Sequence, residues 1–243
     1  MIGLPDHIRA VLFDLDGVLT GTAALHREAW RATFDEFLRH RDPEHFVPFS
    51  DRDYADYVDG RPRADGVRTF LAARGIVLPE GSPDDPPTTN TVHGVGNRKN
   101  ELVQRIMAER GVAPYPGSRR YLEAARDAGL AIAVVTSSAN GAAVLDAADL
   151  TPFVQALIDG LAITEQGLRG KPAPDSFLAG AKALGVEPEH AAVFEDALAG
   201  VAAGHAGGFG YVVGVNRADQ ADALRANGAD IVVDDLAQLL EQS

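Results

Sequence analysis

Two aspartates, Asp14 and Asp16, stand two positions apart directly after the apolar run of residues 10–13. Such a run indicates a buried strand, and open parallel sheets bind ligands just beyond the carboxyl ends of their strands. Two carboxylates this close repel each other unless they share a cation, one holds a proton, or solvent screens them. Asp16-Gly17 alone is equally typical of a turn. The octet of residues 13–20 as a whole favours a chemical site.

Hydroxyl groups follow a second apolar run, residues 130–135, in the tripeptide Thr136-Ser137-Ser138. With the backbone N–H groups before a helix expected to start near Asn140, these hydroxyls suit the binding of an anion. A simple helix cap explains the same residues equally well. A site for phosphoryl transfer needs fixed donors of this kind, together with a nucleophile, a cation and a proton shuttle.

Two charged stretches could supply the remaining groups. Lys171, followed by the rigid Pro172-Ala173-Pro174, could offset the charge of a phosphate, although a lone lysine is more often a surface residue. Glu195 and Asp196 follow the apolar residues 191–194. With Asp14 and a backbone carbonyl they would form the oxygen-rich shell that Mg²⁺ prefers, whereas an isolated acidic pair is usually solvated. We expect each of these stretches to follow a strand.

The elements that must position these residues alternate from residue 117 onward between apolar runs and segments of helical periodicity. This alternation is typical of a parallel sheet flanked by helices. Right-handed crossovers between the strands predict an α/β fold, a three-layer Rossmann-like core with a parallel sheet. The expected strands are residues 10–13, 130–135, 156–158, 191–194, 211–215 and 231–233.

Residues 25–110 show helical stripes and no convincing strand, which predicts an inserted all-helical cap domain that could act as a lid over the aspartates. Glycine and proline near both junctions indicate linkers. We therefore expect a core domain of residues 1–21 and 114–243 and a cap domain of residues 22–113, with an exposed loop at 79–91. The stripes are Trp30, Phe34, Phe37 and Leu38; Val67, Phe70 and Leu71; and Leu102, Val103, Ile106 and Met107.

Composition narrows the class of protein. The chain has 243 residues, 46% of them hydrophobic, and no cysteine, so any metal ligands must be oxygen or imidazole groups. A formal net charge of −13 disfavours nucleic acids and anionic membranes as partners. No apolar run approaches the roughly 20 residues that span a bilayer, and no signal segment is recognisable. We expect a cytoplasmic monomer that needs a local basic pocket or Mg²⁺ to bind a phosphorylated substrate.

The order Asp-x-Asp, Thr/Ser, Lys-Pro and Glu-Asp is similar to the four-motif pattern of the phosphotransferases of the haloacid dehalogenase superfamily. The resemblance covers nearly the whole chain. It implies a covalent aspartyl-phosphate mechanism with Mg²⁺ as cofactor. The implied roles are Asp14 as nucleophile, Asp16 as general acid and base, Thr136 and Lys171 as phosphate ligands, and Asp14, the Asp16 carbonyl, Glu195 and Asp196 as metal ligands.

Within the superfamily, the cap segments resemble the beta-phosphoglucomutase-like branch. The resemblance implies that Arg63 binds the distal phosphate of a sugar bisphosphate and that Lys99 contacts the sugar; arginine suits this role because its fork binds phosphate bidentately. Residues 97–100 are expected to open a helix, where an anion would be favoured. His26 is expected to help position Asp16, and Ser137, Ser138 and Asn140 to contact substrate phosphate.

The branch implies interconversion of beta-glucose 1-phosphate and glucose 6-phosphate through a bisphosphate. A phosphatase with the same core is the alternative, and Ala139 favours it, since the mutases carry a lysine at that position. Gly21 also departs from the branch, which often has an acidic residue there. A receiver-like module would need neither a cap nor Asp16, which argues against this third possibility.

Overall fold

A computed structural model describes residues 2–241. The chain divides into two compact units, of which the first comprises Met1–Gly21 with Val112–Ser243 and the second Thr22–Gly111. We call them the sheet unit and the helical unit. Within the described residues, no helix is long and apolar enough to cross a membrane.

The sheet unit is built on six parallel strands in the order β3-β2-β1-β4-β5-β6. The first strand, β1, pairs with β2 on one side and with β4 on the other, with Ala10 opposite both Ala131 and Ala191. The strands are β1 (Ala10–Phe13), β2 (Ala131–Val135), β3 (Ala156–Ile158), β4 (Ala191–Glu195), β5 (Tyr211–Val215) and β6 (Ile231–Val233). Because β1 lies in the middle, the residues that follow β1, β2 and β4 emerge side by side at one edge of the sheet.

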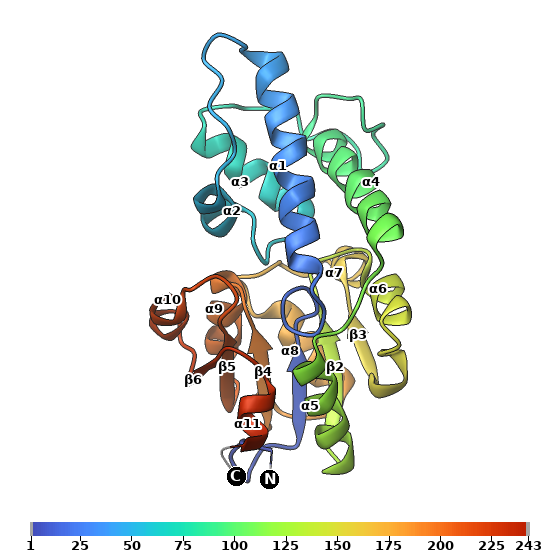
Figure 1. Ribbon diagram of the computed structural model, residues 1–243, viewed down its shortest axis with the longest axis vertical. Coiled ribbons are helices and arrows are strands. Elements are labelled where there is room, and N and C mark those ends of the chain that lie inside the picture. Colours follow the sequence, from blue (N-terminus) through green and yellow to red (C-terminus); the bar gives the residue numbers. More distant parts are fainter. Residues whose placement is uncertain (1, 242–243) are drawn as a thin grey trace. The chain divides into compact units, whose positions relative to one another are not determined.

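Helices cover both faces of this sheet (Figure 1). Alternate strand residues such as Leu12 and Val193 pack with Phe177 of α8 and Val201 of α9 on one face, as the period-2 geometry of strands requires. On the other face, Phe13 and Phe194 contact Tyr121 of α5. The three-layer α/β fold predicted from the sequence is therefore confirmed. The helices are α5 (Pro116–Asp127), α6 (Gly141–Ala147), α7 (Gly160–Glu165), α8 (Asp175–Ala183), α9 (Leu198–Ala206), α10 (Ala221–Ala226) and α11 (Ala237–Glu241), with short 3-10 helices at Thr151–Phe153 and Pro188–His190.

The helical unit is held together by an aromatic core. Phe34 of α1 stacks on Trp30 with ring centres 5.0 Å apart and contacts Phe49 and Phe70 at 5.1 and 4.3 Å. The helices are α1 (Thr22–Arg41), α2 (Asp51–Tyr57), α3 (Arg63–Ala73) and α4 (Val92–Arg110). Three of them contain the predicted apolar stripes. The short α2 was not predicted, because its residues are mostly acidic and polar and Tyr54 is its only buried residue.

Candidate active site

The octet of residues 13–20 begins at the end of β1, and its Asp14 extends the pairing of β1 with β4 by one residue. The Asp14 N–H donates to the Phe194 carbonyl at 2.9 Å, so Asp14 is fixed at the end of the strand, where it is 6% exposed. The chain then turns back through Gly17, whose φ of 97° favours glycine. Its N–H donates to the Thr20 carbonyl at 2.8 Å. Asp16, one residue earlier, stays partly exposed.

Lys171 lies between two carboxylates at the bottom of the site. Its Nζ is 2.7 Å from Asp14 Oδ1 and 2.6 Å from Glu195 Oε1, and it donates to the Val135 carbonyl at 3.1 Å. The side chain is fully buried, with Nζ 4.6 Å from the centre of the Phe177 ring. The expectation that Lys171 follows a strand is wrong. It follows α7 and a turn, and reaches the strand ends because the next helix, α8, packs along β1, β2 and β3.

The charges of the site are unbalanced. Burial raises the pKa of Asp14 above its usual range, and the nearby Glu195 and Asp16 carboxylates raise it further, while Lys171 opposes them. Burial lowers the pKa of Lys171, but the charges of Asp14 and Glu195 outweigh burial and raise it. Lys171 therefore stays protonated, and one ammonium group faces several carboxylates. The arrangement leaves net negative charge that a divalent cation would neutralise.

Three acidic residues of the sheet unit could hold such a cation. Oxygens of Asp14, Glu195 and Asp196 lie within 4.8 Å of one another. The Asp196 carboxylate lies directly against the turn, since a methyl group on Gly17 would come within 2.0 Å of Asp196 Oδ2. Glu195 already accepts two hydrogen bonds, from Lys171 on Oε1 and from the Ala197 N–H on Oε2 at 2.8 Å. Hard oxygen donors with net negative charge fit Mg²⁺.

The hydroxyl segment after β2 faces the second aspartate. Thr136 Oγ1 donates to Asp16 Oδ2 at 3.3 Å and accepts from the Ser138 N–H at 3.1 Å. The Ser138 Oγ in turn accepts from the N–H of Asn140 at 3.2 Å, and Asn140 immediately precedes α6. Ser137 belongs to the same short loop. The structure thus brings Asp14, Asp16, Thr136 and Lys171 together, and it folds the Ser137–Asn140 loop around the Thr136 hydroxyl.

The helical unit carries the other three predicted site residues on three different helices. Lys99 is 4% exposed, and its Nζ lies 2.7 Å from His26 Nδ1 and 5.0 Å from the centre of the Trp30 ring. Lys99 is thus a polar neighbour of His26. The expected influence of His26 on Asp16 stays a prediction.

Arg63 is the first residue of α3, and burial lowers the pKa of its guanidinium. Its Nη2 donates to Asn97 Oδ1 at 3.0 Å. The expectation that residues 97–100 open a helix is wrong: α4 begins at Val92, and the Thr91 side chain caps it by accepting from the Gly94 N–H. Two glycines in its first turns hid this start, because glycine is a poor helix former. Lys99 is therefore in the second helical turn, and its position cannot be explained by the free N–H groups of a helix end.

Two residues of the sheet unit that sequence reasoning did not single out contact the backbone beside the aspartates. Arg217 Nε donates to the Gly17 carbonyl at 2.8 Å, and Gln220 Nε2 donates to the Asp196 carbonyl at 2.9 Å. Both follow β5, at the same edge of the sheet as the other site residues. Their position after a predicted strand was a usable signal, but nothing in their spacing indicates their partners.

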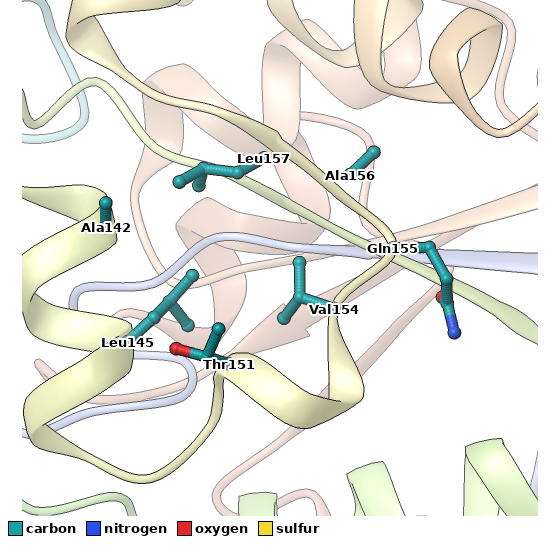
Figure 2. A pocket seen from close by; sticks show the side chains of 7 residues that line it. All are labelled: Ala142, Leu145, Thr151, Val154, Gln155, Ala156 and Leu157. Atoms are coloured by element: carbon teal, nitrogen blue, oxygen red, sulfur yellow. The ribbon is translucent and has the colours of Figure 1, made fainter.

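A cavity of about 230 Å³ lies elsewhere in the sheet unit, between α6, the Thr151–Phe153 turn and β3 (Figure 2). Its lining is mostly apolar and contains no charged residue. It is therefore no candidate for phosphoryl chemistry. The lining residues are Ala142, Leu145, Thr151, Val154, Gln155, Ala156 and Leu157.

Comparisons with known proteins agree with this geometry. The family model for haloacid dehalogenase-like hydrolases matches residues 8–208. A beta-phosphoglucomutase of Mycobacterium bovis is 56% identical over 99% of this chain and 94% of its own length. A validoxylamine A 7'-phosphate phosphatase of Streptomyces hygroscopicus is 28% identical, with 95% of each chain covered. The crystal structure of a beta-phosphoglucomutase from Clostridium difficile has the same fold, with a TM-score of 0.76, 24% identity, and 96% of this chain and 93% of that one covered.

Proposed function

Because the chain belongs to the haloacid dehalogenase-like hydrolase family, we propose that it is a beta-phosphoglucomutase that converts beta-glucose 1-phosphate to glucose 6-phosphate. The observation that carries the proposal is the 56% identity to a beta-phosphoglucomutase over almost the entire length of both chains. The resemblance to a phosphosugar enzyme of this superfamily, inferred from the motifs, is confirmed at the level of the family. The reaction and the roles of the residues are proposals.

The nucleophile in this proposal is Asp14. Lys171 holds Asp14 Oδ1 at 2.7 Å, which leaves the other carboxylate oxygen to attack phosphorus as the bond from phosphorus to the sugar oxygen breaks. Lys171 is too deeply buried to exchange its proton readily with solvent, so its contribution is a fixed positive charge beside the phosphoryl oxygens. Thr136 and the N–H groups of the adjacent loop supply neutral donors.

Asp16 moves the proton. In the first half-reaction it takes the proton from the sugar 6-hydroxyl as that oxygen attacks the phosphoryl group on Asp14, giving glucose 1,6-bisphosphate. In the second it returns this proton to the oxygen on carbon 1 as Asp14 accepts the phosphoryl group of carbon 1. The Thr136 hydroxyl, 3.3 Å from Asp16 Oδ2, orients the carboxylate for both transfers. General acid–base catalysis of this kind contributes about 10²–10⁴-fold to the rate.

Asp14, Asp196 and the Asp16 carbonyl would hold Mg²⁺, which supplies positive charge to the transferring phosphate. Glu195 lies within the same group, but both of its oxygens already accept hydrogen bonds. Its main task in this proposal is to keep Lys171 in place. Arg63 and Lys99 of the helical unit would bind the distal phosphate and the sugar, with Arg63 suited to a phosphate because of its planar fork.

A phosphatase is the second candidate, in which water attacks the phosphoryl group on Asp14. Two observations favour it. Ala139 stands where a mutase carries a lysine, and the alignment with a phosphatase covers 95% of this chain. The mutase is preferred because the phosphatase is only 28% identical.

The test is to incubate the wild-type chain with beta-glucose 1-phosphate, Mg²⁺ and glucose 1,6-bisphosphate, and to measure glucose 6-phosphate and inorganic phosphate side by side. We expect isomerisation to exceed phosphate release and to require the bisphosphate. Phosphate release that is faster, with no activation by the bisphosphate, would show a phosphatase instead.

Variants sharpen this test. Arg63→Ala should weaken the use of the bisphosphate, whereas Arg52→Ala is a matched control because the Arg52 side chain is 90% exposed on α2. Asp16→Asn should reduce turnover of every phosphosugar by about 10²–10⁴-fold. An Asp16→Asn variant with wild-type turnover would show that the proton is carried elsewhere.

A further inference from the structure

The loop after β5, residues 216–220, contacts the backbone of both segments that carry candidate metal ligands. Arg217 Nε donates to the carbonyl of Gly17, the residue after Asp16, at 2.8 Å. Gln220 Nε2 donates to the carbonyl of Asp196 at 2.9 Å. We call residues 216–220 the β5 loop. Its side chains donate to backbone carbonyls on both sides of the acidic group, by which we mean Asp14, Glu195 and Asp196.

The β5 loop is itself held firmly. The Asn216 N–H donates to the Val233 carbonyl at 2.8 Å, and Asn216 Oδ1 accepts from the Gln220 N–H at 2.8 Å, which closes the loop on itself. Asp219 adopts a φ of 52°, a left-handed conformation that aspartate tolerates better than most residues, and it turns the chain between Arg217 and Gln220.

Arg217 donates from two of its three guanidinium nitrogens and also stacks through the flat face of the group. Besides the bond to Gly17, Nη1 donates to the Asp234 carbonyl at 2.8 Å. The flat face stacks on Tyr115, with the guanidinium carbon 3.8 Å from the ring centre. The Tyr115 N–H donates to the Leu19 carbonyl at 2.9 Å, so Arg217 is attached to the octet at two places. Lysine cannot reproduce this combination of fork and stacking.

Gly17 is the point at which such support matters. Glycine at a φ of 97° has few steric limits on its backbone, and the Asp196 carboxylate lies directly against it. Its N–H is held by Thr20 and its carbonyl by Arg217. A rotation at Gly17 would move the Asp16 carbonyl and the Asp16 side chain relative to Asp196.

From this geometry we propose that the β5 loop, through Arg217 and Gln220, is the positioning element of the Mg²⁺ site: it fixes the Asp16–Gly17 turn against Asp196. In this proposal Arg217 is not a metal ligand and acts through Gly17. The inference rests on the proposed function in that it takes these carboxylates as the metal site.

The experiment measures Mg²⁺ binding to the purified full-length chain by titration calorimetry, without substrate. Arg217→Met keeps the apolar stem but removes the donors. We expect its dissociation constant for Mg²⁺ to rise about tenfold or more, the size expected when a hydrogen bond from a charged group is lost. Arg217→Lys should fall between Arg217→Met and the wild type. Weaker Mg²⁺ binding should lower the kcat of Arg217→Met when Mg²⁺ is limiting. Saturating Mg²⁺ should restore most of that kcat.

Arg225→Met is the matched control, because the Arg225 side chain is 56% exposed on the neighbouring helix and pairs only with Asp222 among the ion pairs of the described residues. It should bind Mg²⁺ like the wild type. Without Mg²⁺, Arg217→Met should unfold at a lower temperature than Arg225→Met, because it loses two hydrogen bonds and a stacking contact. Circular dichroism therefore checks that both variants are folded at the temperature of the titration.

A wild-type dissociation constant in Arg217→Met overturns the proposal. If that variant does not fold, Gln220→Ala decides by the same criterion, since it removes only the bond to the Asp196 carbonyl. If the wild type itself binds no Mg²⁺, the metal site of the proposed function is wrong. If the wild type binds Mg²⁺ and the variants bind it equally well, only the role of the β5 loop is wrong.

Discussion

Single residues set the distances within the acidic group, and two of these residues are glycines. Besides Gly17, Gly200 in the first turn of α9 leaves room for Glu195: a methyl group there would lie 1.7 Å from Glu195 Oε1, the oxygen that binds Lys171. The position of Lys171 therefore depends on the absence of a side chain at Gly200 of α9.

Gly200→Ala tests this dependence. Alanine is the better helix former by about 1 kcal/mol, so the helix itself should not suffer. The displaced Glu195 should release Lys171 and lower kcat by about 10²-fold, the scale of a misplacement of about 1 Å. Steady-state kinetics at saturating Mg²⁺, with circular dichroism to check the fold, measures both effects.

Gly21→Ala is the control for adding a methyl group, because the nearest atom would be 3.9 Å away, on the Tyr115 ring. Its activity should stay close to that of the wild type. Wild-type kcat in Gly200→Ala would mean that Glu195 does not hold Lys171 in the working enzyme.

Asp14, Thr136 and Glu195 directly follow predicted strands, and the structure brings them to one edge of the sheet. Lys171 lies in a loop after α7, and only tertiary packing brings this loop to the edge of the sheet where the site lies. Arg217 is harder still, because its partner Gly17 is 200 positions away in the chain. No spacing rule relates two such residues, and only the strand order brings them together.

At the scale of elements, α2 depends on a capping box. Ser50 accepts from the Asp53 N–H at 3.1 Å, and Asp53 Oδ2 accepts from the Ser50 N–H at 2.9 Å and from Arg74 at 2.8 Å. Burial raises the pKa of Asp53, but the bonds from Ser50 and Arg74 outweigh it, and the net effect lowers that pKa.

Asp53→Asn should therefore destabilise the helical unit by about 1 kcal/mol at neutral pH, the usual contribution of a cap. A lowered pKa in the folded state gives stability that is complete above the unfolded value of about 3.9 and is lost as the pH falls from there through the lower folded-state pKa. The difference between variant and wild type should thus shrink as the pH falls below about 3.9.

Trp30 makes the measurement specific. It is the only tryptophan of the chain and belongs to the core of the helical unit, so urea unfolding followed by its fluorescence reports on that unit. Asp56→Asn, at the other end of α2 on a side chain 42% exposed, is the matched control. A pH-independent difference for Asp53→Asn would contradict the assigned cause.

The loop between α3 and α4 supports Arg63 through Asn97. The Asn97 amide donates to the Pro83 and Asp85 carbonyls, both at 2.9 Å, while its oxygen accepts from Arg63 at 3.0 Å. Because both ends of the amide are engaged, Asn97 holds the guanidinium in one place.

Asn97→Ala should free Arg63 and raise the concentration of glucose 1,6-bisphosphate that gives half-maximal mutase activity by about tenfold, as for one lost bond to a charged group. The kcat at saturating bisphosphate should not change. Asn90→Ala, an exposed asparagine of the same loop, should leave both quantities at wild-type values. A fall in kcat alone would contradict the positioning role.

Apolar periodicity predicts the strands and three of the cap helices because burial is what the pattern records. The pattern fails to predict a helix where burial of apolar side chains is not what forms it. The capping box forms α2 almost without apolar residues, and α4 starts at Val92, five residues before Asn97, despite Gly94 and Gly96. Gly96 packs against Arg63, where a methyl group would approach its side chain to 3.2 Å, so close packing outweighs helix propensity there.

At the scale of the whole molecule, the two units should respond differently to Mg²⁺. The acidic group lies within the sheet unit, so binding should stabilise that unit by about 2.7 kcal/mol when Mg²⁺ is at about 100 times its dissociation constant. Hydrogen exchange should slow in β1 and β4 and stay unchanged in the aromatic core around Phe34 and Phe70. Equal protection of both cores would indicate that they unfold together.

The place of β1 at the centre of the sheet also bears on how the chain is made. Ala10 is followed by its β2 partner Ala131 after 121 residues and by its β4 partner Ala191 after 181. At roughly 5–20 residues per second, the first strand waits roughly 10–35 seconds on the ribosome for its second neighbour. The helical unit, continuous in sequence and with its own core, is synthesised completely within that interval. We expect it to fold first during translation, while the octet of the candidate site is still without its neighbouring strands.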